Sequence, residues 1–401
     1  MLRGLCGRDR IESLMGLGRR LAVVAALAMA AAPMLTTGRA GAQQSSSAVE
    51  FETPVVYYIE LVGRVGREIA AKPLRDMLDD AARLDADYII IKLDNTDWEF
   101  TDAGNAEFDV YSFAEEIEPV ITTEIRQIFE EVPEVVFWVF NAKGGACLVP
   151  FTGDQIFFHP GGEMGGIGSL ESLLDGVGDE VVRQKQRSLR LARAQGIAIK
   201  GGYDYRLVNA LAIRSYVLSY RRDGGRIELV VGYDENDGGL TLLTDDGNRR
   251  NGNEDTAEDV ARGRSNDVLM LRERDARLLG VSEGTAEDLD ELLTQLGIYR
   301  NYQMANGRSE QITRSWRRQL SSAERRIIEI YRELQGEDRG RRDDDPRKAI
   351  GRQIRLYEEL LGMHNRFGDA VNSLDVQMTS RPDLQLLIEQ ARLQLLGIVD
   401  N

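Results

Sequence analysis

The chain has 401 residues, of which 42% are hydrophobic, and its 66 acidic and 50 basic side chains give a net charge of −16. The length and hydrophobic content predict a folded core and two or three domains. The acidic balance repels polyanions, so we expect no nucleic-acid partner.

The N-terminus has the layout of a secretory signal peptide. Arg19–Arg20 precede an apolar run, Leu21–Leu35, and the small residues Ala40–Ala42 follow it as a cleavage site. The run is shorter than the roughly 20 apolar residues that span a bilayer. We therefore expect residues 1–42 to be removed, leaving Gln43 first, and the protein to be periplasmic or extracellular. Membrane association is expected only if this segment is retained.

Removal of the signal peptide would change both charge and cysteine content. Residues 1–42 carry six arginines and two acidic residues, so the net charge would move from −16 to −20. Of the two cysteines only Cys147 would remain, so no internal disulfide is expected.

Apolar strands alternate with amphipathic helices in the first part of the mature chain. The expected strands are Val55–Val62, Tyr88–Leu93, Val135–Phe140 and Gln155–His159. Helical stripes at Leu74–Leu84 and Phe113–Ile128 separate the first three strands. This alternation predicts parallel βαβ units with both sheet faces buried, and hence an α/β fold.

The middle of the chain mixes helices, strands and a polar loop. Expected helices are Gly144–Gly153, Glu180–Gln195, Tyr205–Tyr220 and Leu289–Leu296. Arg226–Thr244 predicts a β-hairpin, Val268–Leu271 a strand, and Asp245–Arg264 a flexible excursion.

From about Tyr302 the pattern is helical throughout. Ile312–Ile330 forms one apolar stripe, Ile350–Met378 a heptad-like seam, and Leu384–Leu396 a third helix. We therefore expect a domain at residues 43–300 and an appended α-helical C-terminal module at residues 301–401.

The segment after the third predicted strand carries the most informative motifs. It runs from Asn141–Leu148 (NAKGGACL) through Gly153–Ile156 (GDQI) to Gly165–Ser169 (GGIGS). This order resembles the catalytic region of the ClpP/crotonase-like superfamily, in particular NfeD-type membrane-associated ClpP-class serine proteases and signal-peptide-peptidase-A-like peptidases. Ala276–Val281 is similar to a later family segment, and the resemblance covers roughly residues 55–298.

The resemblance implies a spiral of βαβ units and a Ser–Lys peptidase site, in which lysine takes the proton of the nucleophilic serine. Gly144 stands at the serine position, or Gly145 in the neighbouring register. Neither residue has a side chain, so acyl transfer by the family route cannot run. Lys185 falls in the region of the family's lysine, with Arg187 in the neighbouring register, although a solvated helix lysine is the simpler interpretation.

The resemblance also places the oxyanion region. Asn95, Thr96 and Gly145 correspond to the positions whose donors would stabilise the oxyanion. The family has a Pro-Gly-Gly turn after its second strand, whereas this chain continues as Asn95–Trp98 (NTDW), with acidic residues beyond it. Negative side chains there would oppose a developing negative charge.

Cys147 is the fallback nucleophile, although a buried small hydrophobe is the commoner role for a cysteine in an apolar segment. A dyad with His159 would lack a visible orienting group. The sequence has no Cys/His cluster with zinc spacing and no Walker-type phosphate loop, and the acidic runs lack EF-hand spacing. We expect no metal and no cofactor.

These features predict an exported ClpP-class peptidase homologue that is catalytically inactive, a pseudo-peptidase, binding extended peptide or envelope proteins in its relict groove. The resemblance also implies a homo-oligomer. Two alternatives stay open: an active hydrolase or endopeptidase that uses Cys147, and a structural envelope assembly protein.

Overall fold

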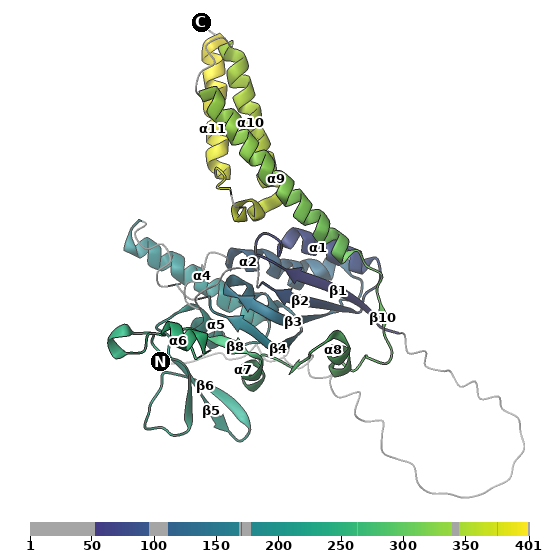
Figure 1. Cartoon of the computed structure of the whole chain (residues 1–401), viewed down its shortest axis with the longest axis vertical. Helices are drawn as coiled ribbons and strands as arrows, with labels where there is room; N and C mark the ends of the chain where they lie inside the picture. The colour runs from purple at the N-terminus through teal and green to yellow at the C-terminus, as the bar shows by residue number, and fades with distance from the viewer. Residues whose placement is uncertain are drawn as a thin grey trace, which may run out of the picture. The chain divides into compact units, whose positions relative to one another are not determined.

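Figure 1 shows the computed structural model of the chain. The structure describes residues 53–95, 111–167, 170, 178–262, 264–338, 345–374 and 376–399. The predicted signal peptide, residues 1–42, lies outside the described residues.

A seven-stranded sheet forms the centre of the fold, in the order β10-β1-β2-β3-β4-β8, with β9 paired to β4. Its strands are β1 (Val55–Val62), β2 (Tyr88–Asp94), β3 (Glu134–Lys143), β4 (Gln155–Gly165), β8 (Met270–Arg272), β9 (Gly284–Thr285) and β10 (Gln303–Met304). Every pair is parallel except β4 with β8. The predicted α/β class is confirmed, whereas the spiral arrangement stays a prediction.

Alternate side chains of each strand are buried on opposite faces of the sheet, as the pleat of a strand requires. In β1, Tyr57, Ile59 and Leu61 join the large core cluster on one face. Val56 points the other way and belongs to a smaller cluster with Leu292. Burial on both faces explains why the strands are continuous apolar runs.

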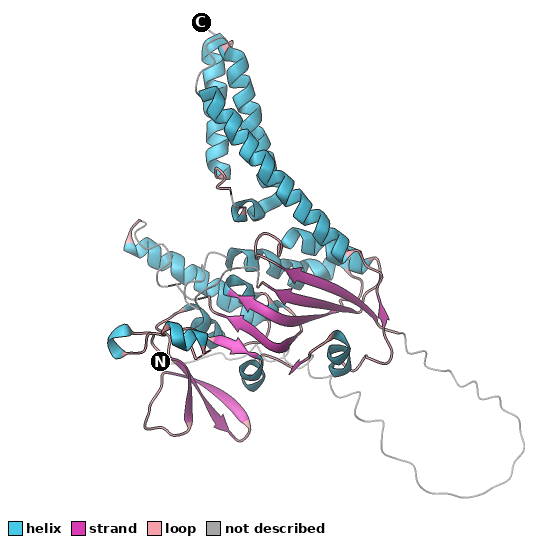
Figure 2. Cartoon of the chain, in the orientation of Figure 1, coloured by secondary structure: helices cyan, strands magenta, loops and turns pink. Residues whose placement is uncertain are grey.

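Helices cover the two faces unequally (Figures 1 and 2). The large cluster includes residues from α1 (Ala71–Ala82), α2 (Tyr111–Pro119), α3 (Ile125–Ile128), α4 (Glu180–Lys200), α5 (Tyr205–Ala212) and α7 (Glu273–Leu278). A π-helical turn, Val120–Glu124, joins α2 to α3 just after Pro119. The other face carries one short helix, α8 (Leu289–Gln295).

A second, three-stranded antiparallel sheet differs from the prediction. Its strands are β5 (Leu218–Asp223), β6 (Arg226–Val231) and β7 (Leu240–Thr244), in the order β6-β5-β7. The predicted hairpin of the last two strands is wrong, because both pair with β5. The expected helix over Tyr205–Tyr220 ends at Ala212. Gly224 and Gly225, with φ of 53° and 87°, make the tight turn that joins β5 to β6.

Strand β4 is longer than predicted and contains a wide irregularity. Its pairing with β3 skips from Val139–Phe158 to Asn141–Glu163, so the segment His159–Gly162 bulges out of the ladder. A Cβ at Gly162 would lie 2.5 Å from the carbonyl oxygen of Val139. Only glycine permits this close approach of the two backbones.

Three long helices follow the sheet domain: α9 (Ser309–Asp338), α10 (Pro346–Phe367) and α11 (Arg381–Val399). They share a hydrophobic cluster that includes Trp316, Leu360 and Leu384. The predicted seam from Ile350 is interrupted, because α10 stops where Gly368 takes a positive φ of 59° and a 3₁₀ turn begins. Among the described helices, none combines the length and apolar character needed to cross a bilayer. The domain boundary predicted near residue 300 stays a prediction.

The buried carboxylate of Asp80 on α1 ties the start of α9 to the sheet. Asp80 is 4% exposed and accepts hydrogen bonds from the Tyr57 hydroxyl (2.9 Å) and from the backbone and Nε of Arg308 (2.7 and 2.9 Å). Arg83 adds a further bond at 3.0 Å. A second tie is the hydrogen bond from Trp316 Nε1 to the carbonyl of Arg67, at 2.7 Å.

We predict that Asp80→Asn lowers the free energy of unfolding by about 2 kcal/mol, because the buried charged acceptor shared by Tyr57, Arg308 and Arg83 is lost. Burial by itself would raise the pKa of Asp80, but the hydrogen bonds from Arg308, Arg83 and Tyr57 outweigh it and lower that pKa to about 2. The contribution of this carboxylate is therefore present above the unfolded-state pKa of about 4 and is lost as the pH falls towards 2. Urea unfolding of both proteins at several pH values measures it.

Asp79→Asn is the matched control, since Asp79 neighbours Asp80 but is exposed on α1. It should change stability by less than about 0.5 kcal/mol. Equal stabilities of Asp80→Asn and the control at pH 7 would contradict the role given to Asp80.

Candidate functional site

The carboxyl ends of four parallel strands meet at one edge of the sheet, which is where open α/β sheets commonly bind ligands. Asn95 follows β2 there, and Gly144 and Gly145 follow β3. These three predicted site residues are therefore brought to the same edge. Thr96, the remaining oxyanion candidate, lies outside the described residues.

The turn at Gly144 is buried and has no reactive side chain. Gly144 has a φ of 61°, in the left-handed region that favours glycine. It begins a 3₁₀ helix, Gly144–Leu148, whose five residues are all buried. A second 3₁₀ turn, Pro150–Thr152, follows. The predicted helix over Gly144–Gly153 is thus two short 3₁₀ segments, because Pro150 lacks the N–H that a continuous α-helix would use.

Asn95 holds this turn through its side chain. Its Nδ2 donates to the carbonyl of Lys143 at 2.8 Å, and its Oδ1 accepts from the Lys143 N–H at 3.0 Å. Its own N–H donates to the carbonyl of Asn141 at 3.1 Å. Since Asn95 is 1% exposed and its amide is engaged in both directions, its side chain is a structural clamp rather than a free oxyanion donor.

Neighbouring groups at the edge are paired with one another. Asn141 Nδ2 donates to the carboxylate of Asp94 at 3.1 Å, and the N–H of Gly63 donates to the Asp94 carbonyl at 3.0 Å. Lys143 Nζ forms an ion pair with Glu163 at 2.7 Å, and Glu163 also contacts Arg272 Nε at 3.4 Å. Lys143, the amine next to the glycine turn, is thus engaged by a carboxylate.

Lys185, the predicted counterpart of the catalytic lysine, lies on the exposed part of α4. That helix begins with Asp179, whose carboxylate accepts the N–H of Val181 at 2.8 Å. Arg187 lies near Glu180, 4.0 Å away. A lysine activated as a base is usually desolvated, so the exposed position agrees with the simpler interpretation of a solvated helix lysine.

Cys147 and His159 do not form a dyad. Cys147 is fully buried in the large core cluster, and burial raises the pKa of its thiol well above the usual range. His159 stacks on Phe140, with ring centroids 4.2 Å apart, and Phe140 packs against the smaller cluster on the other face of the sheet. A buried thiol with a raised pKa is a poor nucleophile.

The second half of the motif that carries the resemblance has a structural role here. The carboxylate of Asp154 accepts the N–H of Val135 at 2.8 Å, and the Asp154 N–H returns a bond to the Val135 carbonyl at 2.8 Å. A Cβ at Gly153 would lie 2.6 Å from the ring of Phe137. These residues set the start of β4 beside β3.

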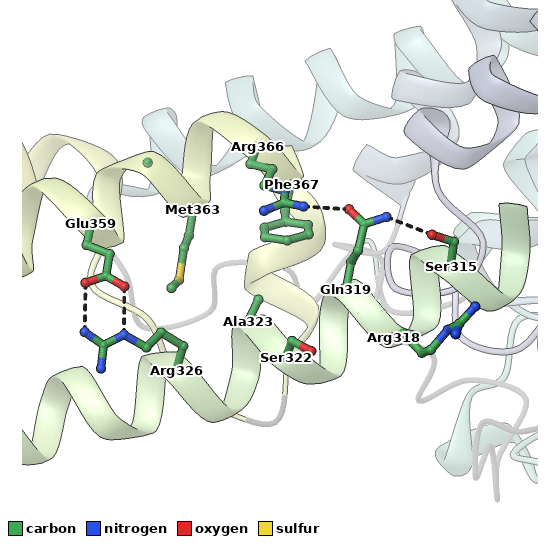
Figure 3. A pocket seen from close by; sticks show the side chains of 11 residues that line it. Ser315, Arg318, Gln319, Ser322, Ala323, Arg326, Glu359, Met363, Arg366 and Phe367 are labelled. Atoms are coloured by element: carbon green, nitrogen blue, oxygen red, sulfur yellow. Dashed lines mark hydrogen bonds and ion pairs between the residues drawn. The ribbon is translucent and has the colours of Figure 1, made fainter.

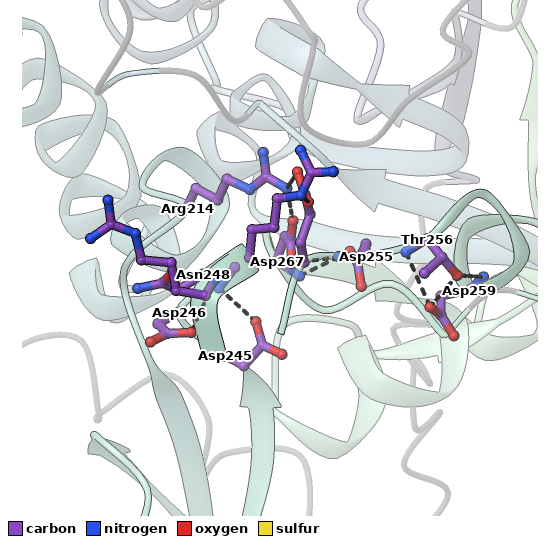
Figure 4. Close-up of polar contacts among 12 residues, drawn as sticks. Arg214, Asp245, Asp246, Asn248, Asp255, Thr256, Asp259 and Asp267 are labelled. Atoms are coloured by element: carbon purple, nitrogen blue, oxygen red, sulfur yellow. Dashed lines mark hydrogen bonds and ion pairs between the residues drawn. The ribbon is translucent and has the colours of Figure 1, made fainter. Parts of the chain in front are cut away.

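The acidic excursion after β7 contains many hydrogen bonds between its own residues (Figure 4). It contains a 3₁₀ turn, Arg249–Asn251, and α6 (Ala257–Ala261). The carboxylate of Asp255 accepts the N–H groups of Asn266 and Asp267 at 3.0 to 3.1 Å, and Asp267 pairs with Arg214. The composition of the segment does not reveal these bonds, and its flexibility stays a prediction.

Several carboxylates of this excursion accept hydrogen bonds from protein groups. Burial is the main cause that raises the pKa of Asp245 and of Asp255, with the nearby Asp267 charge adding to it. Within the described ranges, no group of three or more histidine, cysteine or acidic side chains is placed to hold a metal ion.

Comparison with known proteins finds no family model and no curated protein that matches the chain. Among solved structures, it is similar to a lysine-to-alanine mutant of the 1510-N membrane-bound stomatin-specific protease in complex with a substrate peptide. That match has 14% identity and a TM-score of 0.35, covering 61% of this chain and 80% of the other. A serine-to-alanine mutant of the same protease matches with 14% identity and a TM-score of 0.27, covering 61% and 84%. At these TM-scores, neither match bears on the activity of this chain.

We predict that Asn95→Asp lowers the free energy of unfolding at pH 7 by about 1 to 3 kcal/mol, because a carboxylate accepts the Lys143 N–H but cannot donate to the Lys143 carbonyl. A protonated Asp side chain regains that donor. Part of the loss should therefore be recovered as the pH is lowered from 7 to 5, which denaturant unfolding at the two pH values measures.

Asn95→Ala provides the control for this recovery, since alanine removes both bonds at every pH. A variant Asn95→Asp with wild-type stability at pH 7 would show that the amide clamp does not hold the turn.

Proposed function

We propose that the chain is an exported, catalytically inactive relative of the ClpP-class peptidases that binds polypeptide without cleaving it. The observation that supports inactivity most directly is the turn at Gly144, which has no side chain where a nucleophile would be required. The nearby thiol, Cys147, is fully buried, and burial raises its pKa.

The groups around the turn also argue against catalysis. Lys143 is ion-paired with Glu163, and Lys185 is exposed on α4. The amide of Asn95 is used by the backbone of Lys143. A developing oxyanion needs preorganised donors that are not already engaged. Loss of the nucleophile is thus accompanied by engagement of the other polar groups in structure.

We propose that a polypeptide binds along β8, the outermost strand on one side of the main sheet. In the described sheet, β8 is a terminal strand and has only β4 as a partner. The outer backbone groups of such a strand can pair with an added extended chain. Glu163 forms ion pairs with both Arg272 on β8 and Lys143. These pairs connect β8 to the turn at Gly144. We infer that the relict groove of the peptidase resemblance corresponds to this region.

A second candidate function, assembly, is favoured by the exposed face of α11. Leu386, Leu393 and Leu396 are 57%, 67% and 60% exposed. Leu384 and Ile388, on the opposite face, are buried. At 3.6 residues per turn, the three exposed leucines share one face of the helix. We propose that they mediate homo-oligomerisation of the envelope protein, as a structural assembly function would require.

We predict that neither the mature chain nor its Gly144→Ser variant cleaves an unfolded polypeptide at specific sites, because Lys143, the described amine beside the new hydroxyl, is ion-paired with Glu163. The variant should lose about 1 to 2 kcal/mol of stability, since serine is strained at a positive φ. Mass spectrometry of the incubated polypeptide and denaturant unfolding measure the two effects.

Lys185→Ala is the informative control for this test. Specific cleavage by the wild-type chain that disappears in Lys185→Ala would contradict the proposed inactivity and would support the Ser–Lys mechanism of the family. Specific cleavage that is indifferent to Lys185 would also refute inactivity and would indicate another active centre.

We predict that replacing Leu386, Leu393 and Leu396 together by glutamine reduces the oligomeric mass to that of a monomer, with an unchanged melting temperature, because these side chains are already exposed in one copy. Light scattering measures the mass. Truncation at Tyr302 is a poorer test, since it would remove β10 and Arg308, which contact β1 and Asp80.

Leu189→Gln is the control, since Leu189 is 46% exposed on α4. An unchanged mass in the α11 variant, or an equal loss in the control, would contradict assembly through α11.

A further inference from the structure

The long C-terminal helices enclose a groove that none of the features above uses. It has a volume of about 630 Å³ and is lined only by residues of α9 and α10 (Figure 3). Sites for small ligands and side chains fall in the range of about 300 to 1,000 Å³. The groove is therefore large enough to receive side chains of a bound peptide.

The lining of the groove combines an apolar floor with polar ends. Ala323 and Phe367 are buried, and Met363 is half-buried beside them. At one end, Arg326 of α9 forms two hydrogen bonds with Glu359 of α10, at 2.7 and 2.9 Å. Methionine adapts to differently shaped apolar partners. The floor thus suits an apolar side chain of variable shape.

At the opposite end of the groove, Arg366 is hydrogen-bonded to neutral side chains. Arg366 donates to Gln319 Oε1 at 2.9 Å, and Gln319 Nε2 contacts the Ser315 hydroxyl at 3.2 Å. The guanidinium of Arg366 also lies over the ring of Phe367, 5.2 Å from its centroid. Arg366 is thereby held in place without a carboxylate partner in the described part of the chain.

The three arginines of the groove differ in how far their charge is compensated. Arg326 contacts Glu359, Glu329 and Glu333, which raise its pKa further. Arg318 donates only to the carbonyl of Arg314, at 3.3 Å, among the interactions of the described residues. Among the described residues, no carboxylate forms an ion pair with Arg318 or Arg366, so both supply uncompensated positive charge to the groove.

We propose that the groove between α9 and α10 binds an acidic segment of a partner protein, in which carboxylates flank an apolar side chain. The apolar side chain would contact Ala323, Met363 and Phe367, and the carboxylates would pair with Arg318 and Arg366. Guanidinium groups match carboxylates in charge and in their paired hydrogen-bonding geometry. Glu359 and the acidic surface of the chain disfavour a nucleic acid at the same place.

The test uses the full chain and a rhodamine-labelled peptide, Gly-Glu-Asp-Leu-Glu-Phe-Asp-Gly, with blocked ends. We expect saturable binding by fluorescence anisotropy that weakens as salt is raised, because the pairs are exposed. The amide peptide Gly-Gln-Asn-Leu-Gln-Phe-Asn-Gly should bind at least about tenfold more weakly, and so should the acidic peptide with the Arg318→Gln, Arg366→Gln double variant.

Arg325→Gln is the matched control. Arg325 lies on α9, is exposed, does not line the groove, and contacts the carbonyl of Ser321 at 3.3 Å, as Arg318 does with Arg314. Its substitution should change the affinity less than about twofold. The single variant Arg318→Gln removes no side-chain partner, so its binding can be compared at unchanged melting temperature.

Four results would overturn the proposal. One is the absence of saturable binding up to about 1 mM peptide. Another is an equal loss in Arg325→Gln and Arg318→Gln, which would indicate unspecific attraction. A third is displacement of the peptide by equimolar inorganic phosphate, which would indicate a simple anion site. The fourth is self-association that the double variant abolishes, which would make a second copy of the chain the occupant.

Discussion

The side chain of Asn95 replaces a pair of backbone ladder bonds at the point where β2 and β3 part. The register between these strands shifts after Leu93, so the backbone alone does not continue the ladder to Lys143. The amide both donates to and accepts from Lys143, which few side chains do at once. With the backbone of Lys143 fixed, the chain turns at Gly144 with a positive φ and the following residues enter the core. Among the described residues, the polar groups of this turn are therefore engaged in bonds that fix its backbone.

Much of the main sheet could be predicted from the sequence, because parallel strands buried on both faces are continuous apolar runs such as Tyr88–Leu93. The second sheet could not, since the apolar spacing within Tyr205–Tyr220 fits a helix and a strand about equally. The structure divides that segment into α5 and β5, and the signal that distinguishes them is the Gly224–Gly225 turn. A pair of glycines after an apolar stretch predicts a hairpin to the next strand, and that prediction would have corrected the pairing.

Some features of the candidate site can be predicted from the sequence, whereas others depend on how the strands pair. The absence of a side chain at Gly144 and Gly145, on which the proposed inactivity rests, could be read directly from the sequence. The role of Asn95 could not, since the direction of its amide depends on the register between two strands that are distant in sequence. Cys147 and His159 are close in the chain, but β4 carries His159 towards the other face of the sheet. The number of residues between Cys147 and His159 does not tell on which face of the sheet His159 lies, because the bulge in β4 changes the alternation of side chains.

The bonds around Asp80 couple the C-terminal helices to the sheet. Arg308, at the residue before α9, shares the Asp80 carboxylate with Tyr57 of β1, and Trp316 binds the carbonyl of Arg67. The start of α9 is therefore fixed to β1 and to the loop that follows β1, while the groove between α9 and α10 begins at Ser315, next to Trp316. Under the function that we propose, a polypeptide held in the groove would lie beside the sheet at a position fixed by this anchor, and it would be bound rather than cut.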